Sequence, residues 1–276
     1  MASKTVLITG SSTGIGRAAA IHFQKQGWNV AATMRTPNRE KELQKLPGVI
    51  CPALDVTDPN SIASALAETM ERFGSIDAIV NNAGYGLTGP FEGVSEEQVR
   101  RQFETNVFGL MRMTKAILPH FRERKAGVIL NVSSMGGRVV FPFYSIYHAT
   151  KWAVEGFTES LRFEVEPLGI RLKIIEPGAI KTDFYDRSGD STLSASPKAY
   201  QKWTDIGFKN MNAVGAKGAP PEAVARVIFR AATDNSSRLR YPVGSDAKSL
   251  LFIRKLMTDG MFAAVVNSQV FKGIAK

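Results

Sequence analysis

The N-terminal segment combines a short apolar run, a glycine-rich turn and a helical pattern. Residues 5–9 are apolar or β-branched, which is typical of a buried strand. Gly10, Gly14 and Gly16 follow, and a helical pattern covers residues 15–26. The first glycine permits a tight turn, the second lets a pyrophosphate approach the backbone, and the third allows close helix–strand packing. Because the helix N-terminus offers free N–H groups to phosphates, the segment predicts a dinucleotide-binding unit, with a purely structural turn as the alternative.

Apolar runs alternate with helical patterns along the rest of the chain, which favours a parallel sheet covered on both faces. A chain of 276 residues fits one α/β domain, residues 1–276. The predicted fold is a Rossmann-type, doubly wound sheet of about seven parallel strands with helices on both faces. Strands are expected near residues 5–9, 28–34, 49–55, 76–81, 126–133, 170–176 and 240–243, and helices near 15–26, 60–73, 95–122, 147–168 and 221–232.

Local signals mark several predicted helix starts. Ser61 and Ser95 precede helical runs as N-caps, and Ser95 with Gln98 resembles a capping box. Pro221 fits the first turn of the next helix.

Two regions lie outside the strand–helix alternation. The irregular stretch 177–220 is too long for an ordinary connection, and we expect a substrate lid at about 183–220. Amphipathic pieces at 250–253 and 262–266 predict a helical C-terminal extension, at about 248–276, that packs on the body or on a second subunit, with association with a membrane surface as the alternative.

Tyr147 and Lys151 are the first catalytic candidates. Residues four apart share one helix face, so the phenol and the ammonium can meet the same small molecule. The ammonium stabilises a phenolate and lowers the tyrosine pKa from its usual value of about 10. Such a tyrosine can give or take a proton at a carbonyl or alcohol oxygen. The alternative is a surface pair without chemistry. Ser133 and Ser134 lie upstream.

Several motifs in register resemble the short-chain dehydrogenase/reductase family, in its compact single-domain branch. They are Thr9-Gly10-x-x-x-Gly14-Ile15-Gly16, Asn81-Asn82-Ala83-Gly84, Ser134, Tyr147-x-x-x-Lys151 and Pro177-Gly178. The resemblance extends from residue 4 to about residue 247. Gly84-Tyr85-Gly86 and the stretch 147–156 are similar to the hydroxysteroid and retinol dehydrogenase-like members.

The resemblance implies a catalytic set of Asn106, Ser134, Tyr147 and Lys151. In it, Tyr147 is the general acid and base, and Lys151 lowers its pKa and holds the nicotinamide ribose. Ser134, rather than Ser133, donates a hydrogen bond to the substrate oxygen, and Asn106 holds a water that links Lys151 to solvent. His148 is interpreted as structural. Adjacent positions on a helix face about 100° apart, so His148 does not share the face of Tyr147.

The resemblance also implies the residues that bind the cofactor. Gly10, Ser12, Ile15 and Gly16 border the phosphates, and Asp55 contacts the adenine. Tyr147 and Lys151 contribute from the catalytic set, and the remaining contacts are Asn82, Ala83, Gly84, Pro177, Gly178, Ile180 and Thr182, the last at the carboxamide. Structural readings stay open for Asn82, as a tie between strands, and for Asp55, as a solvated carboxylate.

The end of the second predicted strand indicates NADP(H), with NAD(H) less favoured. Folds that select NAD place an acidic side chain there for the ribose 2′-hydroxyl. Here the position is Met34, and Arg35 follows, whose guanidinium can hold a 2′-phosphate. Thr13 stands where the family offers a second basic residue, which weakens the argument, and Arg35 as a solvated loop cation is the alternative.

The predicted function is interconversion of a bulky, mainly apolar ketone or aldehyde and its alcohol. Tyr85, Leu87, Phe141, Phe143, Tyr144 and aromatic residues between Phe184 and Met211 are expected to line the pocket. A non-catalytic NADP(H)-binding sensor would not need the complete catalytic set. A sugar-nucleotide epimerase or dehydratase usually carries a larger C-terminal domain. Both remain as alternatives.

Composition restricts the partners. The net charge of +10 is spread along the chain without a nucleic-acid motif, so no nucleic acid is expected. Three histidines and Cys51 do not make a metal site, and a single cysteine fits a reducing, cytoplasmic setting. No apolar run reaches the roughly 20 residues that span a bilayer, so membrane association is not expected. The expected partners are a small-molecule substrate and further copies of the chain, as a homodimer or homotetramer.

Overall fold

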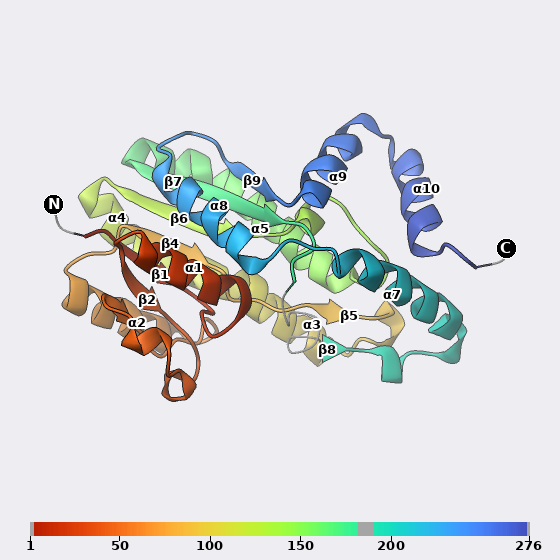
Figure 1. The fold of residues 1–276 in the computed structure, drawn as a ribbon, viewed down its shortest axis with the longest axis horizontal. Helices are drawn as coiled ribbons and strands as arrows, with labels where there is room; N and C mark the ends of the chain where they lie inside the picture. The colour runs from red at the N-terminus through yellow and green to blue at the C-terminus, as the bar shows by residue number, and fades with distance from the viewer. Residues whose placement is uncertain (1–2, 182–189, 275–276) are drawn as a thin grey trace.

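Seven strands form one sheet in the order β3-β2-β1-β4-β6-β7-β9, and every neighbouring pair is parallel (Figure 1). The computed structural model describes residues 3–181 and 190–274. The strands are β1 (Thr5–Ile8), β2 (Asn29–Ala32), β3 (Val49–Ile50), β4 (Ala78–Asn81), β6 (Gly127–Val132), β7 (Ile170–Pro177) and β9 (Arg240–Val243). The chain builds outward from β1 on one side and from β4 on the other, which confirms the predicted doubly wound sheet.

Helices cover both faces of this sheet. One face carries α1 (Gly14–Lys25) and α8 (Pro221–Thr233), and the other carries α2 (Pro59–Phe73), α4 (Leu110–Arg124) and α5 (Ser145–Val165). Strand β1 shows why: Val6 and Ile8 belong to the core on the α1 side, whereas Leu7 belongs to the opposite core. Alternate residues of a strand point to opposite faces, so a strand buried on both sides is apolar throughout.

The predicted helix over 95–122 is interrupted. It consists of α3 (Glu96–Phe103), a π-helical turn at Glu104–Gly109, and α4. The capping box at its start is confirmed, since Ser95 Oγ accepts from the Gln98 N–H at 3.2 Å and the Ser95 N–H donates to Gln98 Oε1 at 3.0 Å. The hydrophobic pattern of the sequence does not reveal the π turn, because a single widened turn barely changes a 3.6-residue repeat.

Two local predictions were wrong in detail. Asp58, not Ser61, caps α2, because Asp58 Oδ1 accepts from the Asn60 N–H at 2.9 Å. Strand β3 ends at Ile50 instead of residue 55, and Pro52 follows, which has no N–H for a sheet ladder. The pairing with the second strand resumes only as an isolated bridge between Met34 and Ala53.

A second group of elements lies beyond one end of the sheet (Figure 1). It holds the short parallel pair β5 (Leu87–Thr88) and β8 (Asp190–Ser191), helix α7 (Gln201–Gly215), and the C-terminal helices α9 (Ser245–Leu256) and α10 (Asp259–Val270). Helix α7 occupies part of a stretch predicted to be irregular. It packs against the end of α10, where the Trp203 ring meets the Phe271 ring edge-on at 5.0 Å. Short 3₁₀ turns lie at Pro37–Arg39, Leu43–Lys45, Phe91–Gly93, Met135–Gly137, Glu166–Leu168, Leu193–Ala195 and Lys198–Tyr200.

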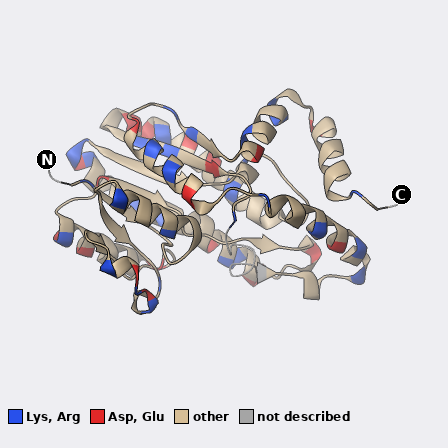
Figure 2. Cartoon of the chain, viewed as in Figure 1, with Lys and Arg blue, Asp and Glu red and all other residues tan. Residues whose placement is uncertain are grey.

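Basic and acidic positions are interspersed over the chain (Figure 2). Among the residues that the structure describes, no helix is long and apolar enough to cross a membrane. Residues 3–181 and 190–274 also contain no group of three or more His, Cys, Asp or Glu side chains placed to hold a metal ion.

Candidate active site

The glycine-rich turn lies between β1 and α1, beside the loop that follows β4. Gly10 has a φ of +69° and Gly14 a φ of +56°, conformations that glycine adopts without strain. A Cβ on Gly16 would stand 2.3 Å from the Gly10 carbonyl oxygen. The turn therefore needs glycine for close packing and for a left-handed backbone, as the sequence predicted. Ser12 is exposed and Ile15 half-buried at its rim.

Asn82 closes this turn from the neighbouring strand. Its side-chain amide donates to the Thr9 carbonyl at 2.9 Å and to the Gly10 carbonyl at 3.1 Å. Thr9 Oγ1 accepts in return from the backbone N–H groups of Asn82 and Ala83, both at 3.0 Å. The structural reading of Asn82 therefore holds: it ties the ends of β1 and β4 together at the switch point of the sheet, where doubly wound folds bind ligands.

Within the described part of the chain, the N-terminus of α1, at Thr13, has no side-chain cap, and the first turn of the helix holds no acidic residue. Uncapped N–H groups at a helix N-terminus bind anions such as phosphate. The turn thus fits a pyrophosphate.

The edge beyond β2 and β3 holds a mixture of charges. Met34 is buried at the end of β2, and Arg35 is exposed directly after it. Glu40, which the sequence reasoning did not consider, accepts a hydrogen bond from Arg17 at 2.5 Å. Burial favours the neutral form of Glu40, but the Leu43 N–H and the Arg17 guanidinium outweigh it and lower the carboxyl pKa. Asp55 Oδ1 accepts from the Thr57 N–H at 2.9 Å.

Lys151 is buried beside Tyr147 on the first turns of α5. Its Nζ donates to the Val132 carbonyl oxygen at 2.9 Å and lies 5.8 Å from the centroid of the Tyr147 ring. Burial lowers the Lys151 pKa to about 8, against the opposing effect of the Glu155 carboxylate. An ammonium held here stabilises negative charge on the neighbouring phenol.

The two serines after β6 point to different places. Ser133 is buried, and its N–H donates to the Ile175 carbonyl within the sheet at 2.9 Å. Ser134 is half-exposed, and its Oγ accepts from the Gly136 N–H at 3.0 Å. Ser134 follows by two residues the Val132 carbonyl that accepts from Lys151 Nζ.

Asn106 lies in the π-helical turn and is buried. Its Oδ1 accepts from the Tyr85 N–H at 3.1 Å, and its Nδ2 donates to the Tyr85 carbonyl at 2.9 Å and to Thr150 Oγ1 at 3.2 Å. A Cβ on Gly84 would stand 3.0 Å from Asn106 Oδ1 and 3.9 Å from Lys151 Nζ. Asn106, Gly84 and Lys151 therefore converge, although they come from three separate elements.

The predicted cofactor-binding residues Pro177, Gly178 and Ile180 lie at the end of β7 and directly after it. The Gly178 N–H donates to the Val243 carbonyl at 2.9 Å, and the Ala179 N–H donates to Asp246 Oδ2 at 2.7 Å. Asp246 is a residue that the sequence reasoning missed, and it leaves no room for a side chain on Gly178, whose Cβ would lie 2.3 Å from Oδ2. Pro177 ends β7, and Ile180 pairs with Ala219 in an isolated bridge. Thr182 lies outside the described residues.

A buried pair of carboxyl groups lies behind Lys151. Arg240 Nε donates to Glu155 Oε2 at 2.9 Å, and Arg138 Nη1 donates to Glu176 Oε1 at 3.3 Å. Burial and the neighbouring Glu176 raise the Glu155 pKa to about 7, although Ser133 and Arg240 act in the opposite direction. Burial also raises the pKa of Glu176. Sequence reasoning missed this pair because Glu155 comes from α5 and Glu176 from β7, and their arginine partners come from β9 and from the turn after β6.

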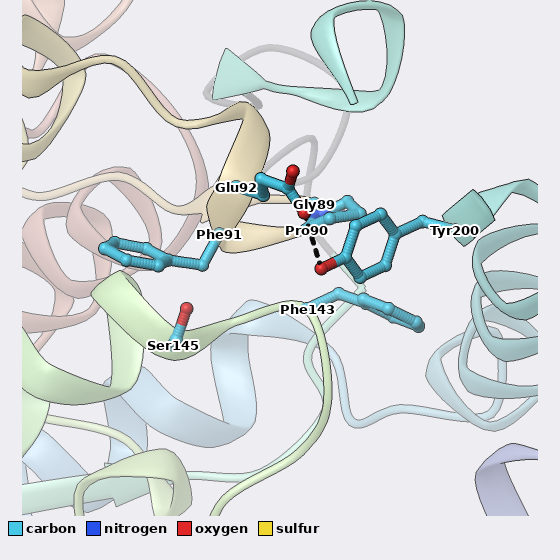
Figure 3. Close-up of a pocket in the computed structure, with 7 residues that line it drawn as sticks. All are labelled: Gly89, Pro90, Phe91, Glu92, Phe143, Ser145 and Tyr200. Atoms are coloured by element: carbon cyan, nitrogen blue, oxygen red, sulfur yellow. Dashed lines mark hydrogen bonds between the residues drawn. The ribbon is translucent and has the colours of Figure 1, made fainter. Parts of the chain in front are cut away.

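A pocket of about 480 Å³ lies between the segment after β5 and the start of α5 (Figure 3). Its lining consists of Gly89, Pro90, Phe91, Glu92, Phe143, Ser145 and Tyr200. The Tyr200 hydroxyl donates to Glu92 Oε2 at 2.9 Å across its mouth. Two of the residues predicted to line a substrate pocket, Phe143 and Tyr200, are part of this lining.

Aromatic rings connect this pocket to Tyr147. Phe143 stacks on Phe208 at 5.4 Å, Phe208 meets Tyr144 at 6.2 Å, and Tyr144 meets Tyr147 at 6.4 Å. Three aromatic residues predicted to line the substrate pocket, Phe143, Tyr144 and Phe208, therefore lie in one series of ring contacts that reaches Tyr147. Leu87 is buried, and Tyr85 lies under the Arg101 guanidinium at 5.8 Å. Phe184 and Tyr185 lie outside the described residues.

Comparisons with known proteins agree with this geometry. A family described as short chain dehydrogenase matches residues 4–192. An uncharacterized oxidoreductase of Schizosaccharomyces pombe is 38% identical, over 86% of this chain and 99% of its own. Retinol dehydrogenase 8 of Bos taurus is 32% identical, over 94% of this chain and 87% of its own.

Solved structures share the fold. A short-chain dehydrogenase from Streptomyces avermitilis has a TM-score of 0.82 and 33% identity, and the match covers 99% of this chain and 98% of that one. ElxO with NADP bound has a TM-score of 0.75 and 28% identity, covering 90% and 99%. A 3-ketoacyl-(acyl-carrier-protein) reductase from Brucella melitensis, complexed with NADH, has a TM-score of 0.72 and 25% identity, covering 87% and 97%. With the family match over most of its length and relatives along nearly all of it, this chain belongs to the short-chain dehydrogenase/reductase family and is an oxidoreductase.

Proposed function

We propose that this oxidoreductase uses NADP(H) to interconvert a bulky, mainly apolar ketone or aldehyde and its alcohol, with Tyr147 as general acid and base. The observation that carries the proposal is the buried Lys151 ammonium, 5.8 Å from the Tyr147 ring centroid, at the strand end that also presents Ser134. A sensor or a binding module has no need for a buried cation beside a phenol.

Each member of the catalytic set has a separate role. In the reductive direction, the Tyr147 hydroxyl protonates the substrate oxygen as negative charge develops there, and in the oxidative direction the phenolate removes that proton. Lys151 stabilises the phenolate, and the Ser134 hydroxyl donates a hydrogen bond to the same oxygen. Asn106 holds a water that connects Lys151 to solvent. The chemistry that the nicotinamide supplies when bound is hydride transfer.

In this proposal a dinucleotide binds at the ends of β1 and β4, beside the N-terminus of α1. Gly10, Ser12, Ile15 and Gly16 would border the pyrophosphate at the open N-terminus of α1. Asp55 would contact the adenine at the end of the β3 segment. The ribose and nicotinamide would be held by Asn82, Ala83, Gly84, Tyr147, Lys151, Pro177, Gly178, Ile180 and Thr182.

The preference for NADP(H) over NAD(H) rests on Met34 and Arg35. A buried methionine at the end of β2 offers no acceptor to a 2′-hydroxyl, and an exposed arginine beside it can pair with a 2′-phosphate. ElxO, a structural relative, binds NADP, which supports the proposal. The ratio of kcat/KM for NADPH and NADH tests it, since a tenfold preference corresponds to about 1.4 kcal/mol of transition-state binding.

The apolar substrate class rests on the aromatic rings that extend from Tyr147 through Tyr144 and Phe208 to Phe143. The name of the relative retinol dehydrogenase 8 points to the same class. A panel of aromatic, cyclic and long-chain carbonyls, followed at 340 nm, tests the proposal. Faster reduction of small 2-oxo acids would contradict it.

We also propose a single domain over residues 1–276, with a substrate lid at about 183–220 and the helical extension at about 248–276. Contacts between α7 and the end of α10 support a joint cover, because Asn210 Nδ2 donates to the Val270 carbonyl at 2.9 Å. A homodimer or homotetramer in the cytoplasm is proposed as the working form. Light scattering during size-exclusion chromatography tests the assembly.

A further inference from the structure

The loop after β6 carries Ser134, and its shape depends on a few short contacts. Ser134 begins the 3₁₀ turn Met135–Gly137, and the Gly136 N–H donates to Ser134 Oγ at 3.0 Å. A hydroxyl has one proton and two acceptor lone pairs. Because Gly136 occupies a lone pair of Ser134 Oγ, the hydroxyl proton turns toward a different acceptor. The position of the Gly136 N–H therefore restricts the directions in which the Ser134 proton can point.

His148 bonds the carbonyl group of the same residue, on the other side of the Gly136 Cα. Its Nδ1 lies 2.9 Å from the Gly136 carbonyl oxygen, and the Phe141 N–H donates to its Nε2 at 3.0 Å. Since Nε2 accepts, Nδ1 carries the proton and donates to Gly136. One neutral imidazole thus spans the loop from Gly136 to Phe141 and fixes both of its ends.

The surroundings keep this imidazole neutral and in place. His148 is 5% exposed, and its ring is surrounded by those of Phe141, Tyr144 and Tyr147 at 6.0, 5.9 and 5.8 Å. Burial lowers its pKa to about 4, despite the hydrogen bond with Gly136 that acts to raise it. A Cβ on Gly136 would lie 2.7 Å from Nδ1 and 2.8 Å from Cε1, so the glycine is what lets the ring approach.

We propose that His148 is a positioning residue that acts through Gly136 to aim the Ser134 hydroxyl at the substrate oxygen. The inference rests on the proposed function, because it assigns Ser134 a donor role in turnover. His148 itself does not touch the substrate. It lies next to Tyr147 in the chain, so a single helical turn supplies both the proton-transfer group and the support for its partner.

The kinetic test compares two substitutions of His148. His148→Phe keeps a buried ring but loses both hydrogen bonds, and we expect kcat to fall about tenfold with little change in substrate KM. His148→Asn keeps an N–H near the place of Nδ1 and should recover most of that loss. NADPH binding, measured by fluorescence, should stay unchanged in both. His22→Asn, which removes an imidazole from the far end of α1, is the matched control and should keep wild-type turnover.

A double-mutant cycle separates positioning from a general packing defect. Ser134→Ala should lower kcat about a hundredfold, the size of effect seen when one oxyanion donor is lost. If His148 acts through Ser134, His148→Phe should have less than a twofold further effect in the Ser134→Ala background. A further tenfold loss there, or a His148→Phe enzyme within twofold of wild type, would overturn the inference.

A spectroscopic measurement keeps this result apart from the proposed function. ¹⁵N NMR of the histidine side chains should show His148 as the neutral Nδ1–H tautomer from about pH 5.5 to 8. An Nε2–H tautomer, or titration near the ordinary histidine pKa of about 6.5, would contradict the inference whatever the activity. A wild-type protein that turns over none of the carbonyl panel would instead contradict the proposed function.

Discussion

Lys151 Nζ donates a hydrogen bond to the Val132 carbonyl oxygen at 2.9 Å, which ties the ammonium to the end of β6. The bond spans 19 residues of sequence and is buried. It fixes the distance between α5, which carries Tyr147, and the strand end that carries Ser134. Lys151 therefore links α5 to the end of β6, and in the proposed mechanism the same ammonium stabilises negative charge on the Tyr147 phenol.

Tyr147→Phe should abolish turnover and leave the fold intact. The substitution removes only the hydroxyl that transfers the proton, and a general acid contributes about 10²–10⁴-fold. Steady-state kinetics at 340 nm measures the loss, with circular dichroism as the check on folding. Tyr241→Phe is the matched control. Its hydroxyl lies outside the candidate site and donates to Asp234 Oδ2 at 2.6 Å. A Tyr147→Phe enzyme that kept more than a tenth of the wild-type rate would exclude the general-acid role.

Lys151→Ala should lower kcat and weaken cofactor binding together. The substitution removes the cation beside the phenol and the proposed donor to the nicotinamide ribose. We expect kcat to fall about 10²-fold or more. The Kd for NADPH, measured by fluorescence titration, should rise about tenfold, which corresponds to a loss of ~1.4 kcal/mol of binding free energy. The exposed Lys115→Ala, on α4, controls for the loss of one positive charge. Unchanged NADPH affinity in Lys151→Ala would refute its contact with the cofactor.

Gly16→Ala should impair cofactor binding and stability. The new Cβ would stand 2.3 Å from the Gly10 carbonyl and 2.6 Å from Asn82 Nδ2, so the turn has to move. Overpacking of this kind costs about 1–3 kcal/mol. Gly156→Ala on α5 is the matched control, since a Cβ there meets nothing within 4 Å and should be neutral or stabilise the helix. Thermal unfolding with and without NADPH measures both effects, and equal behaviour of the two variants would argue against the packing role.

Glu155 should make the protein less stable as the pH rises. Its pKa is raised from 4.5 to about 7 in the folded protein, chiefly by burial and then by Glu176. Between these values the folded state binds more protons than the unfolded state, so the stability present below pH 4.5 is lost as the pH rises through 7. As the pH rises from 4.5 to 7, the free energy of unfolding of Glu155→Gln should increase relative to that of the wild type by roughly 1–3 kcal/mol. Denaturant unfolding measures this difference.

The control for that experiment is Glu159→Gln. Glu159 is exposed, and its hydrogen bond with Arg240 lowers its pKa, so its removal should not reproduce the gain. Other charged groups around Glu155 are Glu176, Arg240 and Lys151, and all stay in place in both variants. A difference between wild type and Glu155→Gln that does not change with pH would contradict the raised pKa.

The double substitution Met34→Asp and Arg35→Ala should shift the cofactor preference toward NAD(H). The aspartate offers an acceptor to the 2′-hydroxyl and repels a 2′-phosphate, while the loss of Arg35 removes its partner. We expect the ratio of kcat/KM for NADPH over NADH to fall at least tenfold, or about 1.4 kcal/mol. Lys25→Ala, at the far end of α1, controls for net charge. No change in the ratio would sink the assignment of these positions.

Local sequence determined the parts of this protein that depend on neighbouring residues. Gly10, Gly14 and Gly16 are needed within one turn, Tyr147 and Lys151 share a helix face, and the Ser95 capping box closes on itself. The alternation of apolar runs and helical patterns predicted the seven-stranded sheet, because each period reflects one kind of backbone.

Tertiary structure alone decided what depends on distant segments. The His148 imidazole became a support for Ser134 because the Gly136–Phe141 loop folds back over α5. Asn106 reached Gly84 through a π turn that leaves almost no trace in the hydrophobic pattern, and Asp246 met the turn after β7 from the start of α9. The Glu155 and Glu176 pair formed between α5 and β7. Its partner Arg240, which donates to Glu155, lies 85 residues beyond Glu155 in the sequence. Burial shifts the pKa values of such groups, and burial is a property of the packed chain, so no local pattern could have predicted them.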